Sequence, residues 1–259
     1  MAERSGARME AMIACPTCGT RNETPSPVCA RCGGSLLGAA AGAVRGRPMV
    51  SLRVVRADGG PEQVVQMRQD VLTCGRRGDL ALVDDPFVAT EQARFYFHGQ
   101  RLAVEDVGGG NGVFQRLHAE RELPVGSELR LGRQRLILEP IPSPQPGADN
   151  VLAWGSPDMG GQVRLVQLLE GGARGAAFPL REGHNLLGRE LGDITFPEDG
   201  FVSGRHAMLS VEGGRVLVRD LGSSNGTFIR LGGPAYVDHG DQFLMGRQLL
   251  RLEVQALST

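Results

Sequence analysis

The sequence contains one internal repeat with an offset of 114 residues, and this repeat constrains the architecture more than any other feature. The segment 107–114 aligns with 221–228 around a shared Asn-Gly pair, and the Gly-Arg-Gln triplet at 132–134 recurs at 246–248. At about 95 residues, each copy is too long for a solenoid unit and suits a globular domain. The chain is therefore predicted to hold two domains of one fold in tandem, which we call the first repeat and the second repeat.

Within each repeat, apolar residues alternate with a period of two, which is typical of half-buried β-strands. Such runs occupy Arg94–Phe97, Arg101–Val104, Val163–Leu168, Arg215–Arg219 and Leu249–Val254. Gly-rich turn signals separate the runs, and the 38 glycines of the chain are about twice the average share. No stretch of 48–259 indicates a helix longer than a turn or two. The pattern predicts an all-β fold in which each repeat forms a β-sandwich.

Four of the five cysteines form two Cys-x-x-Cys pairs near the N-terminus, Cys15 with Cys18 and Cys29 with Cys32. A Gly follows each pair and permits the positive φ of a tight turn. Four thiolates complete the closed tetrahedral shell of structural Zn²⁺, so we predict a small zinc ribbon that resembles those of bacterial regulatory proteins. A redox dithiol is the competing interpretation, but it needs a βαβ context. Cys74 lies alone in an apolar run and is predicted to be buried.

Low-complexity segments mark the boundaries between these parts. Residues 33–47 are mostly small and uncharged, and Pro recurs at every second position in 140–146, which favours stiff, extended backbone. The predicted organisation is a zinc ribbon at 11–36, a linker at 37–47, the first repeat at 48–140, a Pro-rich linker at 141–160 and the second repeat at 161–256.

Charge and hydropathy argue against several classes of protein. No apolar run approaches the roughly 18 residues that span a bilayer, and charged residues at positions 4, 8 and 10 interrupt any signal peptide, so we expect a cytoplasmic protein without a membrane partner. The formal net charge of −1 creates no strong field for nucleic acid. Residues 1–47 nevertheless carry six Arg against three acidic residues, which leaves a zinc-ribbon nucleic-acid-binding regulator as an alternative.

Cationic and hydroxyl side chains gather in the Gly-rich loops of the second repeat. These side chains are Arg189, Ser203, Arg205, Ser224 and Asn225. Loops at one end of a sandwich converge on one surface, and such donors suit the binding of a tetrahedral oxyanion. Ser203 and His206 do not make a hydrolase pair, since no orienting acid and no nucleophile elbow accompany them. We therefore do not expect an enzyme.

The second repeat resembles a forkhead-associated (FHA) domain, a phosphothreonine-binding β-sandwich. The resemblance covers about 160–256 and depends on a Gly-Arg pair at 188–189, a Ser-x-x-His element at 203–206 and a Gly-Ser-x-Asn-Gly-Thr loop at 222–227. It implies that Arg189 and Ser203 hold the phosphate. It also implies that Ser224 and Asn225 hold the phosphate or the backbone of the bound peptide.

The same resemblance implies supporting roles near the site. These fall to His206, which braces the loops, to Gly226, which supplies a turn, and to Gly188 and Thr227. One departure from the family pattern is Gly204, because many FHA domains carry Arg or Lys directly after the Ser. Arg205 follows Gly204 and is therefore a candidate for the second cation.

The first repeat keeps only part of this constellation. Arg76, Asn111 and Gly112 are present, and Gly109–Gly110 stand where the second repeat has two serines. The positions of Ser203, Arg205 and His206 are occupied by Ala89, Glu91 and Gln92. A missing hydroxyl and an added anion both oppose phosphate binding. We therefore predict an FHA-like fold with little or no affinity for phosphothreonine.

The resulting hypothesis is a non-enzymatic adaptor in Ser/Thr kinase signalling. Its second FHA domain binds phosphothreonine-containing proteins, either kinase substrates or a kinase, while its first is degenerate. Structural Zn²⁺ is the one cofactor that we predict. A scaffold that binds proteins independently of phosphate is the other alternative.

Overall fold

The computed structural model describes residues 12–15, 20–23, 26, 28–31, 36, 47–56, 62–143, 145–156 and 160–255. These residues form strands and two single turns of 3₁₀-helix, η1 (Ala148–Asn150) and η2 (Glu170–Gly172). The all-β prediction is confirmed, and the five strands predicted from alternation agree with the observed ones to within two residues at each end. No helix in these ranges is long and apolar enough to cross a membrane.

The two repeats contribute ten strands each in the same order. The first repeat contains β3 (Met49–Val55), β4 (Val64–Gln66), β5 (Val71–Gly75), β6 (Leu80–Ala81), β7 (Ala93–His98), β8 (Arg101–Asp106), β9 (Val113–Arg116), β10 (Arg121–Glu122), β11 (Glu128–Leu131) and β12 (Gln134–Pro140). The second repeat contains β13 (Val163–Leu168), β14 (Arg174–Pro179), β15 (Gly183–Gly188), β16 (Ile194–Thr195), β17 (Ala207–Glu212), β18 (Arg215–Asp220), β19 (Thr227–Arg230), β20 (Ala235–Tyr236), β21 (Gln242–Met245) and β22 (Gln248–Gln255). Near the N-terminus, β1 (Met12–Ala14) pairs antiparallel with β2 (Arg21–Glu23).

The chain folds into two compact units that do not coincide with the repeats. Unit 1 contains Met1–Val113 and Leu231–Thr259, and unit 2 contains Phe114–Arg230. The chain passes from one unit to the other within β9 and again after β19. Unit 1 therefore combines the first six strands of the first repeat with the last three of the second, and unit 2 combines the first seven strands of the second repeat with β9–β12 of the first. The boundaries 48–140 and 161–256 delimit the sequence repeats and stay a prediction.

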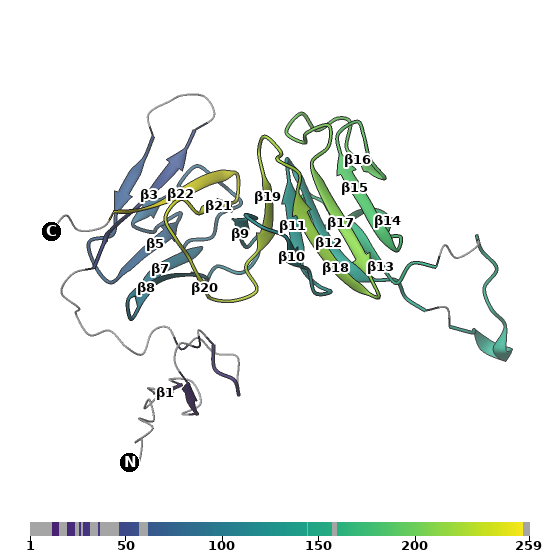
Figure 1. Ribbon diagram of the computed structural model, residues 1–259, viewed down its shortest axis with the longest axis horizontal. Coiled ribbons are helices and arrows are strands. Elements are labelled where there is room, and N and C mark those ends of the chain that lie inside the picture. The colour runs from purple at the N-terminus through teal and green to yellow at the C-terminus, as the bar shows by residue number, and fades with distance from the viewer. Residues whose placement is uncertain are drawn as a thin grey trace, which may run out of the picture. The chain divides into compact units, whose positions relative to one another are not determined.

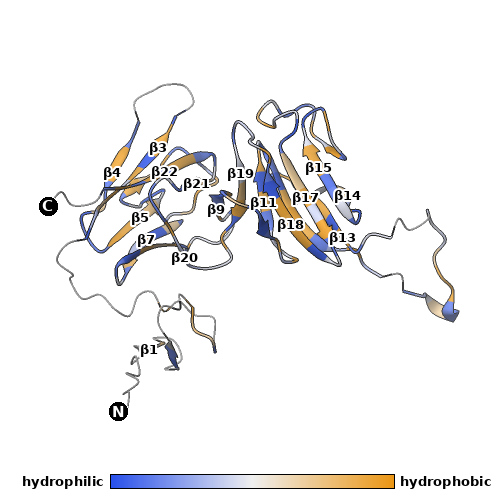
Figure 2. Ribbon diagram, viewed as in Figure 1, coloured by the Kyte–Doolittle hydropathy of each residue, from blue (hydrophilic) through white to orange (hydrophobic). Residues whose placement is uncertain are grey.

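In unit 1, strands in the order β20-β8-β7-β5-β6 face strands in the order β21-β22-β3-β4. The yellow β22 runs antiparallel to β3, from the pair Leu249 and Val55 to the pair Gln255 and Met49 (Figure 1). Along β3 the residues alternate between buried and partly exposed, and this alternation of apolar and polar residues recurs along other strands (Figure 2). The period-two pattern therefore places one face of each strand in the core.

Unit 2 combines the two repeats the other way round and contains both β9 and its counterpart β19. Strands β10-β18-β17-β15-β16 form one sheet, and β14-β13-β12-β11-β19-β9 form the facing one. Here β12 pairs antiparallel with β13, from Leu136 with Gln167 to Pro140 with Val163, and β11 pairs with β19. The last strands of the first repeat thus complete the sandwich of the second repeat.

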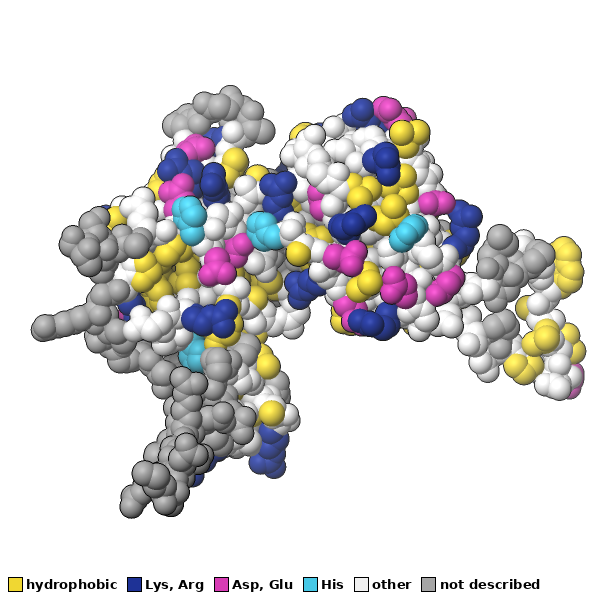
Figure 3. Space-filling model, in the orientation of Figure 1, with side chains coloured by type: hydrophobic (Ala, Val, Ile, Leu, Met, Phe, Trp, Pro, Cys, Tyr) yellow, Lys and Arg dark blue, Asp and Glu magenta, His cyan; other side chains and the backbone are white. Residues whose placement is uncertain are grey.

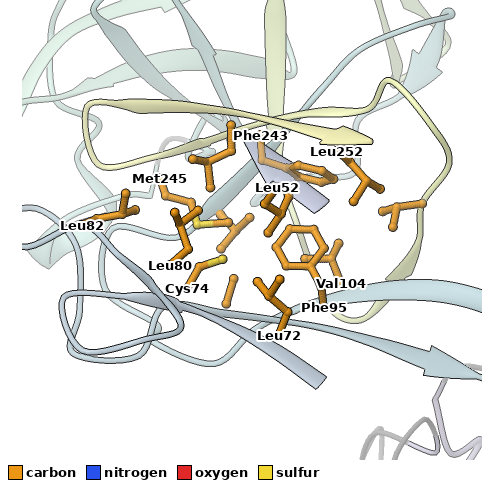
Figure 4. Close-up of a cluster of buried hydrophobic side chains, with 14 of the residues drawn as sticks. Leu52, Leu72, Cys74, Leu80, Leu82, Phe95, Val104, Phe243, Met245 and Leu252 are labelled. Carbon is orange, nitrogen blue, oxygen red and sulfur yellow. The ribbon is translucent and has the colours of Figure 1, made fainter. Parts of the chain in front are cut away.

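The exchanged strands supply central core residues. In unit 1, Phe243, Met245 and Leu252 of the second repeat are fully buried among side chains such as Phe95 and Cys74 (Figure 4). The rings of Phe95 and Phe243 meet edge to face with centroids 5.3 Å apart. Each buried side chain of this size contributes about 1.5–3 kcal/mol, so unit 1 depends on the exchange for its stability. The predicted burial of Cys74 is confirmed, and burial raises the pKa of its thiol.

Candidate functional site

Three loops of unit 2 meet at Ser203. The backbone N–H of Arg189, which follows β15, donates to the Ser203 carbonyl oxygen at 2.9 Å. The backbone N–H of Ser224, in the loop between β18 and β19, donates to the Ser203 Oγ at 3.1 Å. The structure therefore brings together Arg189, Ser203 and Ser224, which come from three separate segments of the sequence.

Gly188 allows the first two of these loops to approach. A Cβ at this position would collide with the carbonyl oxygens of Gly204 and Leu191. The Leu191 N–H also donates to the Gly204 carbonyl oxygen at 3.2 Å, which holds the two segments together. The Gly-Arg pair of the sequence is thus a glycine required by close backbone contact, followed by the arginine that the contact positions.

His206 is fully buried and links two loops. Its Nδ1 accepts a hydrogen bond from the Ser203 N–H at 3.0 Å, so the ring hydrogen lies on Nε2, which donates to the Gly226 carbonyl oxygen at 3.1 Å. Burial lowers the pKa of His206, although the Gly226 carbonyl and Asp220 oppose the shift in part. The imidazole is therefore a neutral brace between the Ser203 loop and the loop that contains Gly226.

Sequence reasoning missed Asp220, which organises the loop between β18 and β19. Its Oδ1 accepts from the Gly222 and Ser223 N–H groups at 2.9 and 2.8 Å, and its Oδ2 accepts from Ser223 Oγ at 2.7 Å and Thr227 Oγ1 at 2.6 Å. Burial alone would raise the pKa of Asp220, but these hydrogen bonds outweigh it and lower the pKa. An Asp placed just before a Gly-Ser turn is the signal that could have revealed it.

The two serines of this loop have different surroundings. Ser223 is buried, and its hydroxyl donates to Asp220 and accepts from the Gly226 N–H at 2.9 Å. Ser224 is exposed. The Ser223 hydroxyl is therefore used within the loop, whereas the Ser224 side chain faces solvent at the rim of the site.

The remaining predicted site residues lie at the same end of unit 2. The Asn225 Nδ2 donates to the Phe201 carbonyl oxygen at 2.8 Å, which ties the loop between β18 and β19 to the segment before Ser203. The Arg189 guanidinium is half-exposed and pairs with Glu190 at 3.0 Å. Arg205 is exposed and has no side-chain hydrogen bond or ion pair with the described residues.

The corresponding loops of unit 1 keep this frame with different side chains. The Gln92 Oε1 accepts from the Ala89 N–H at 3.1 Å, and its Nε2 donates to Asp106 Oδ1 at 2.9 Å, so Gln92 braces the loops where His206 does in unit 2. The Asn111 Nδ2 donates to the Phe87 carbonyl oxygen at 3.0 Å. The braces are kept, while the hydroxyl at position 89 is absent.

The anion that replaces Arg205 in unit 1 is engaged locally. Glu91 forms an ion pair with Arg94 three residues later. The loop after β8 also differs in backbone, because Gly109 and Gly110 both have positive φ, at 57° and 50°. No serine corresponding to Ser224 could adopt that conformation without strain.

Two of the four predicted zinc ligands lie within the described residues. Cys15 and Cys29, one from each Cys-x-x-Cys pair, are both buried in a small cluster with Leu36. Cys18 and Cys32 lie outside the described residues. In the ranges that the structure describes, no three His, Cys, Asp or Glu side chains are grouped so as to hold a metal ion.

On the face shown in Figure 3, basic and acidic side chains are interspersed over the described parts of both units. The described part of this face therefore shows no wide surface with a single sign of charge.

Comparison with known proteins identifies the domains. The family model described as FHA domain matches residues 72–132 and 185–246, one match in each repeat. The chain therefore contains two FHA domains in tandem, and the FHA family comprises phosphothreonine-peptide-binding domains that are typically non-catalytic.

Each individual relative matches a segment of this chain about as long as one domain. The curated FHA domain-containing protein FhaB of Mycobacterium tuberculosis is 39% identical over 67 residues, which span 26% of this chain and 43% of FhaB. A solved FHA domain studied for phosphothreonine-dependent interactions is 29% identical, with a TM-score of 0.23, and covers 36% of this chain and 99% of its own. An FHA domain from Chlamydia trachomatis is 26% identical, with a TM-score of 0.20, and covers 30% and 85%.

Proposed function

We propose that this protein is a phosphothreonine-dependent adaptor whose binding site lies in unit 2. The observation that carries the proposal is the convergence of three loops on Ser203, with Arg189 and Ser224 beside it. The backbone contacts thus bring together loops that carry a cationic, a hydroxyl and an exposed serine side chain. A second cation, Arg205, lies two residues further along the same loop.

The chemistry of the ligand fits this set of donors. A phosphothreonine carries nearly two negative charges and three strong acceptor oxygens. Arginine donates paired hydrogen bonds to such a group, and each charge-assisted hydrogen bond contributes about 1.5–3 kcal/mol. Asn225 has its Nδ2 fixed on the Phe201 carbonyl, so its Oδ1 is the atom suited to accept from a peptide N–H.

Unit 1 is proposed to bind no phosphothreonine. Arg76 is present, and its N–H donates to the Ala89 carbonyl oxygen at 2.9 Å as in unit 2. However, Ala89 lacks the hydroxyl that Ser203 has at the same position. Glu91 also adds an anion that would repel phosphate. These loops of unit 1 are instead proposed to contact a partner protein independently of phosphate.

Partners of the adaptor are proposed to be proteins that Ser/Thr kinases phosphorylate, or such a kinase itself. This follows from the ligand alone, since phosphothreonine arises from these enzymes. The chain would then join a phosphorylated protein, bound by unit 2, to whatever unit 1 and the N-terminal segment bind.

We also propose a structural zinc ion held by Cys15, Cys18, Cys29 and Cys32. The burial of Cys15 and Cys29 in one cluster supports it, because a closed four-thiolate site excludes water. Zinc analysis of the full-length protein should give one ion per chain, and Cys15→Ser combined with Cys29→Ser should remove it. Wild-type protein prepared anaerobically that neither contains zinc nor takes it up would contradict this proposal.

The binding proposal is tested by fluorescence polarisation of the full-length protein with a degenerate phosphothreonine peptide library. We expect phosphate-dependent binding that Arg189→Ala weakens about ten- to a hundredfold, because charge-assisted hydrogen bonds are lost. The matched control is Arg76→Ala, the same position of the first repeat, which should leave binding unchanged. Equal binding of unphosphorylated peptides, or an equal loss in both variants, would contradict the proposal.

A further inference from the structure

We propose that the phosphothreonine site of unit 2 is a composite of both repeats, completed by Arg116 and by the turn Leu131–Gln134 of the first repeat. This inference rests on the function proposed above. In the composite site, Arg133 supplies a cation beside the phosphate and favours peptides with an acidic residue near the phosphothreonine.

The turn between β11 and β12 is fixed on the loop that leads to Ser203. The Arg133 N–H and the Gln134 Nε2 both donate to Asp199 Oδ2 at 2.8 Å. Gly132 has φ of +55°, and a Cβ there would lie 2.8 Å from the Val202 Cγ2. The turn is therefore seated closely against residues 199–202, directly before Ser203.

Asp199 transmits this contact to the loop. It is buried, with 4% of its surface exposed, and its Oδ1 accepts from the Phe201 N–H at 3.0 Å. The Val202 N–H donates to the Asp199 carbonyl oxygen at 3.0 Å. One carboxylate thus holds a turn of the first repeat and a loop of the second repeat together, so the position of Ser203 depends on both.

Arg133 also places a charge at the rim. Its guanidinium lies over the ring of Phe201, with 4.9 Å between the guanidinium carbon and the ring centroid, and forms no ion pair with the described residues. Phe201 is 46% exposed and precedes Ser203 by two residues. Since an extended peptide advances about 3.3 Å per residue, a side chain a few positions from the phosphothreonine can reach this cation.

A second arginine of the first repeat touches the loop between β18 and β19. A Cβ on Gly226 would lie 2.5 Å from the Arg116 Nε, so the Arg116 side chain lies directly against this glycine. Gly226 accepts the hydrogen bond from His206 and follows Asn225. Arg116 therefore packs behind the residues proposed to contact the peptide and positions them.

Unit 1 contains the same junction with the repeats reversed, and this provides a matched control. The Arg247 N–H donates to Asp85 Oδ2 at 2.6 Å, and the Arg247 guanidinium lies over Phe87 at 4.5 Å. Position 89 of that unit is Ala, so Arg247 lies beside a loop without the serine. Arg133 and Arg247 thus occupy equivalent turns, but only Arg133 is close to the proposed phosphate site.

The first test compares these two arginines in the full-length protein by fluorescence polarisation. The probes are phosphothreonine peptides with Glu or with Ala at the second to fourth positions on either side. We expect Arg133→Ala to weaken binding of the Glu peptides about three- to tenfold, since one nearby charge is lost, and to erase their advantage over the Ala peptides. Arg247→Ala should change neither quantity. A loss confined to Arg247→Ala, or the same result in both variants, would overturn the composite site.

The second test needs no ligand. A site-specific protease sequence inserted after Trp154, which is 98% exposed in the linker between β12 and β13, allows the chain to be cut between the repeats. Because each unit contains strands of both repeats, the two products should stay together in native gel filtration and separate in denaturant. Native separation into two folded halves would overturn the inference.

The two proposals fail differently. If no phosphothreonine peptide binds, the proposed function fails, and the cleavage result alone decides whether the units combine both repeats. If peptides bind and Arg189→Ala weakens them while Arg133→Ala does not, the function stands and the composite site fails.

Discussion

Unit 1 and unit 2 share a loop frame and differ at its rim. In both units an amide or imidazole braces the loops, an Asn ties them together, and a Gly-Arg-Gln turn rests on a buried Asp. The rim of unit 2 has Ser203, Arg205 and Ser224, where that of unit 1 has Ala89, Glu91 and Gly110. The bracing side chains thus maintain the loop structure in both units, while phosphate binding is expected to depend on a few exposed side chains beside them.

The largest effect is expected when unit 2 receives the rim of unit 1. The triple variant Ser203→Ala, Arg205→Glu, Ser224→Gly removes two donors and a cation and adds an anion. We expect phosphothreonine affinity to fall by more than about a hundredfold in polarisation assays, as charge-assisted hydrogen bonds are lost. Thermal unfolding should stay close to wild type because His206 and Asp220 remain. Retained affinity in a folded variant would show that the rim does not define the difference.

The reciprocal exchange should succeed only in part. Ala89→Ser with Glu91→Arg restores a hydroxyl and a cation in unit 1, in a protein whose unit 2 site is removed by Ser203→Ala. We expect binding at least about tenfold weaker than wild type, because Gly109 and Gly110 have positive φ and present no serine. Titration by polarisation measures it, and affinity equal to wild type would mean that the backbone of this loop is irrelevant.

A smaller effect is expected from the anion beside Arg189. Glu190 pairs with the guanidinium and competes with phosphate for it. Glu190→Gln should therefore strengthen peptide binding about two- to fivefold, and the gain should shrink at high salt because exposed charges are screened. Weaker binding in this variant would indicate that Glu190 helps to orient Arg189.

The smallest effect is expected from His206, which braces the loops of unit 2 as Gln92 braces those of unit 1. Because burial lowers the pKa of His206, the folded protein resists protonation there, while the unfolded chain takes up a proton near the ordinary value of about 6.5. The free energy of unfolding should thus fall as the pH drops below about 6.5. His206→Gln, which copies Gln92, removes this titratable imidazole, so the unfolding midpoint of the variant should depend less on pH. Parallel profiles for the two proteins would contradict the neutral brace.

The sequence predicted the strands and the all-β class because alternation reports local burial. It did not predict the exchange, since β12 and β22 carry equivalent residues at the same repeat positions and fit either partner strand. Glu139 and Glu253 illustrate this, as Glu253 pairs with Arg53 at 3.0 Å while Glu139 lies near Arg164 at 3.5 Å. Which of two similar strands completes a sandwich depends on connections that local patterns do not encode.

For the site, the sequence indicated which loops carry donors but not what holds them. Asp199 and Asp220 appear in the sequence as ordinary loop carboxylates, yet both accept several backbone and side-chain hydrogen bonds. The sequence also does not show that Ser223 is used within the loop while Ser224 is exposed, because this depends on which hydroxyl faces Asp220.

Calorimetric titration of the protein with a phosphothreonine peptide selected from the library tests whether the phosphate site lies in unit 2. We expect one peptide bound per chain, binding that Ser203→Ala removes, and unchanged stoichiometry and affinity in Arg76→Ala. Two peptides per chain, or one peptide that still binds after Ser203→Ala and is lost in Arg76→Ala, would contradict the assignment of the site to unit 2.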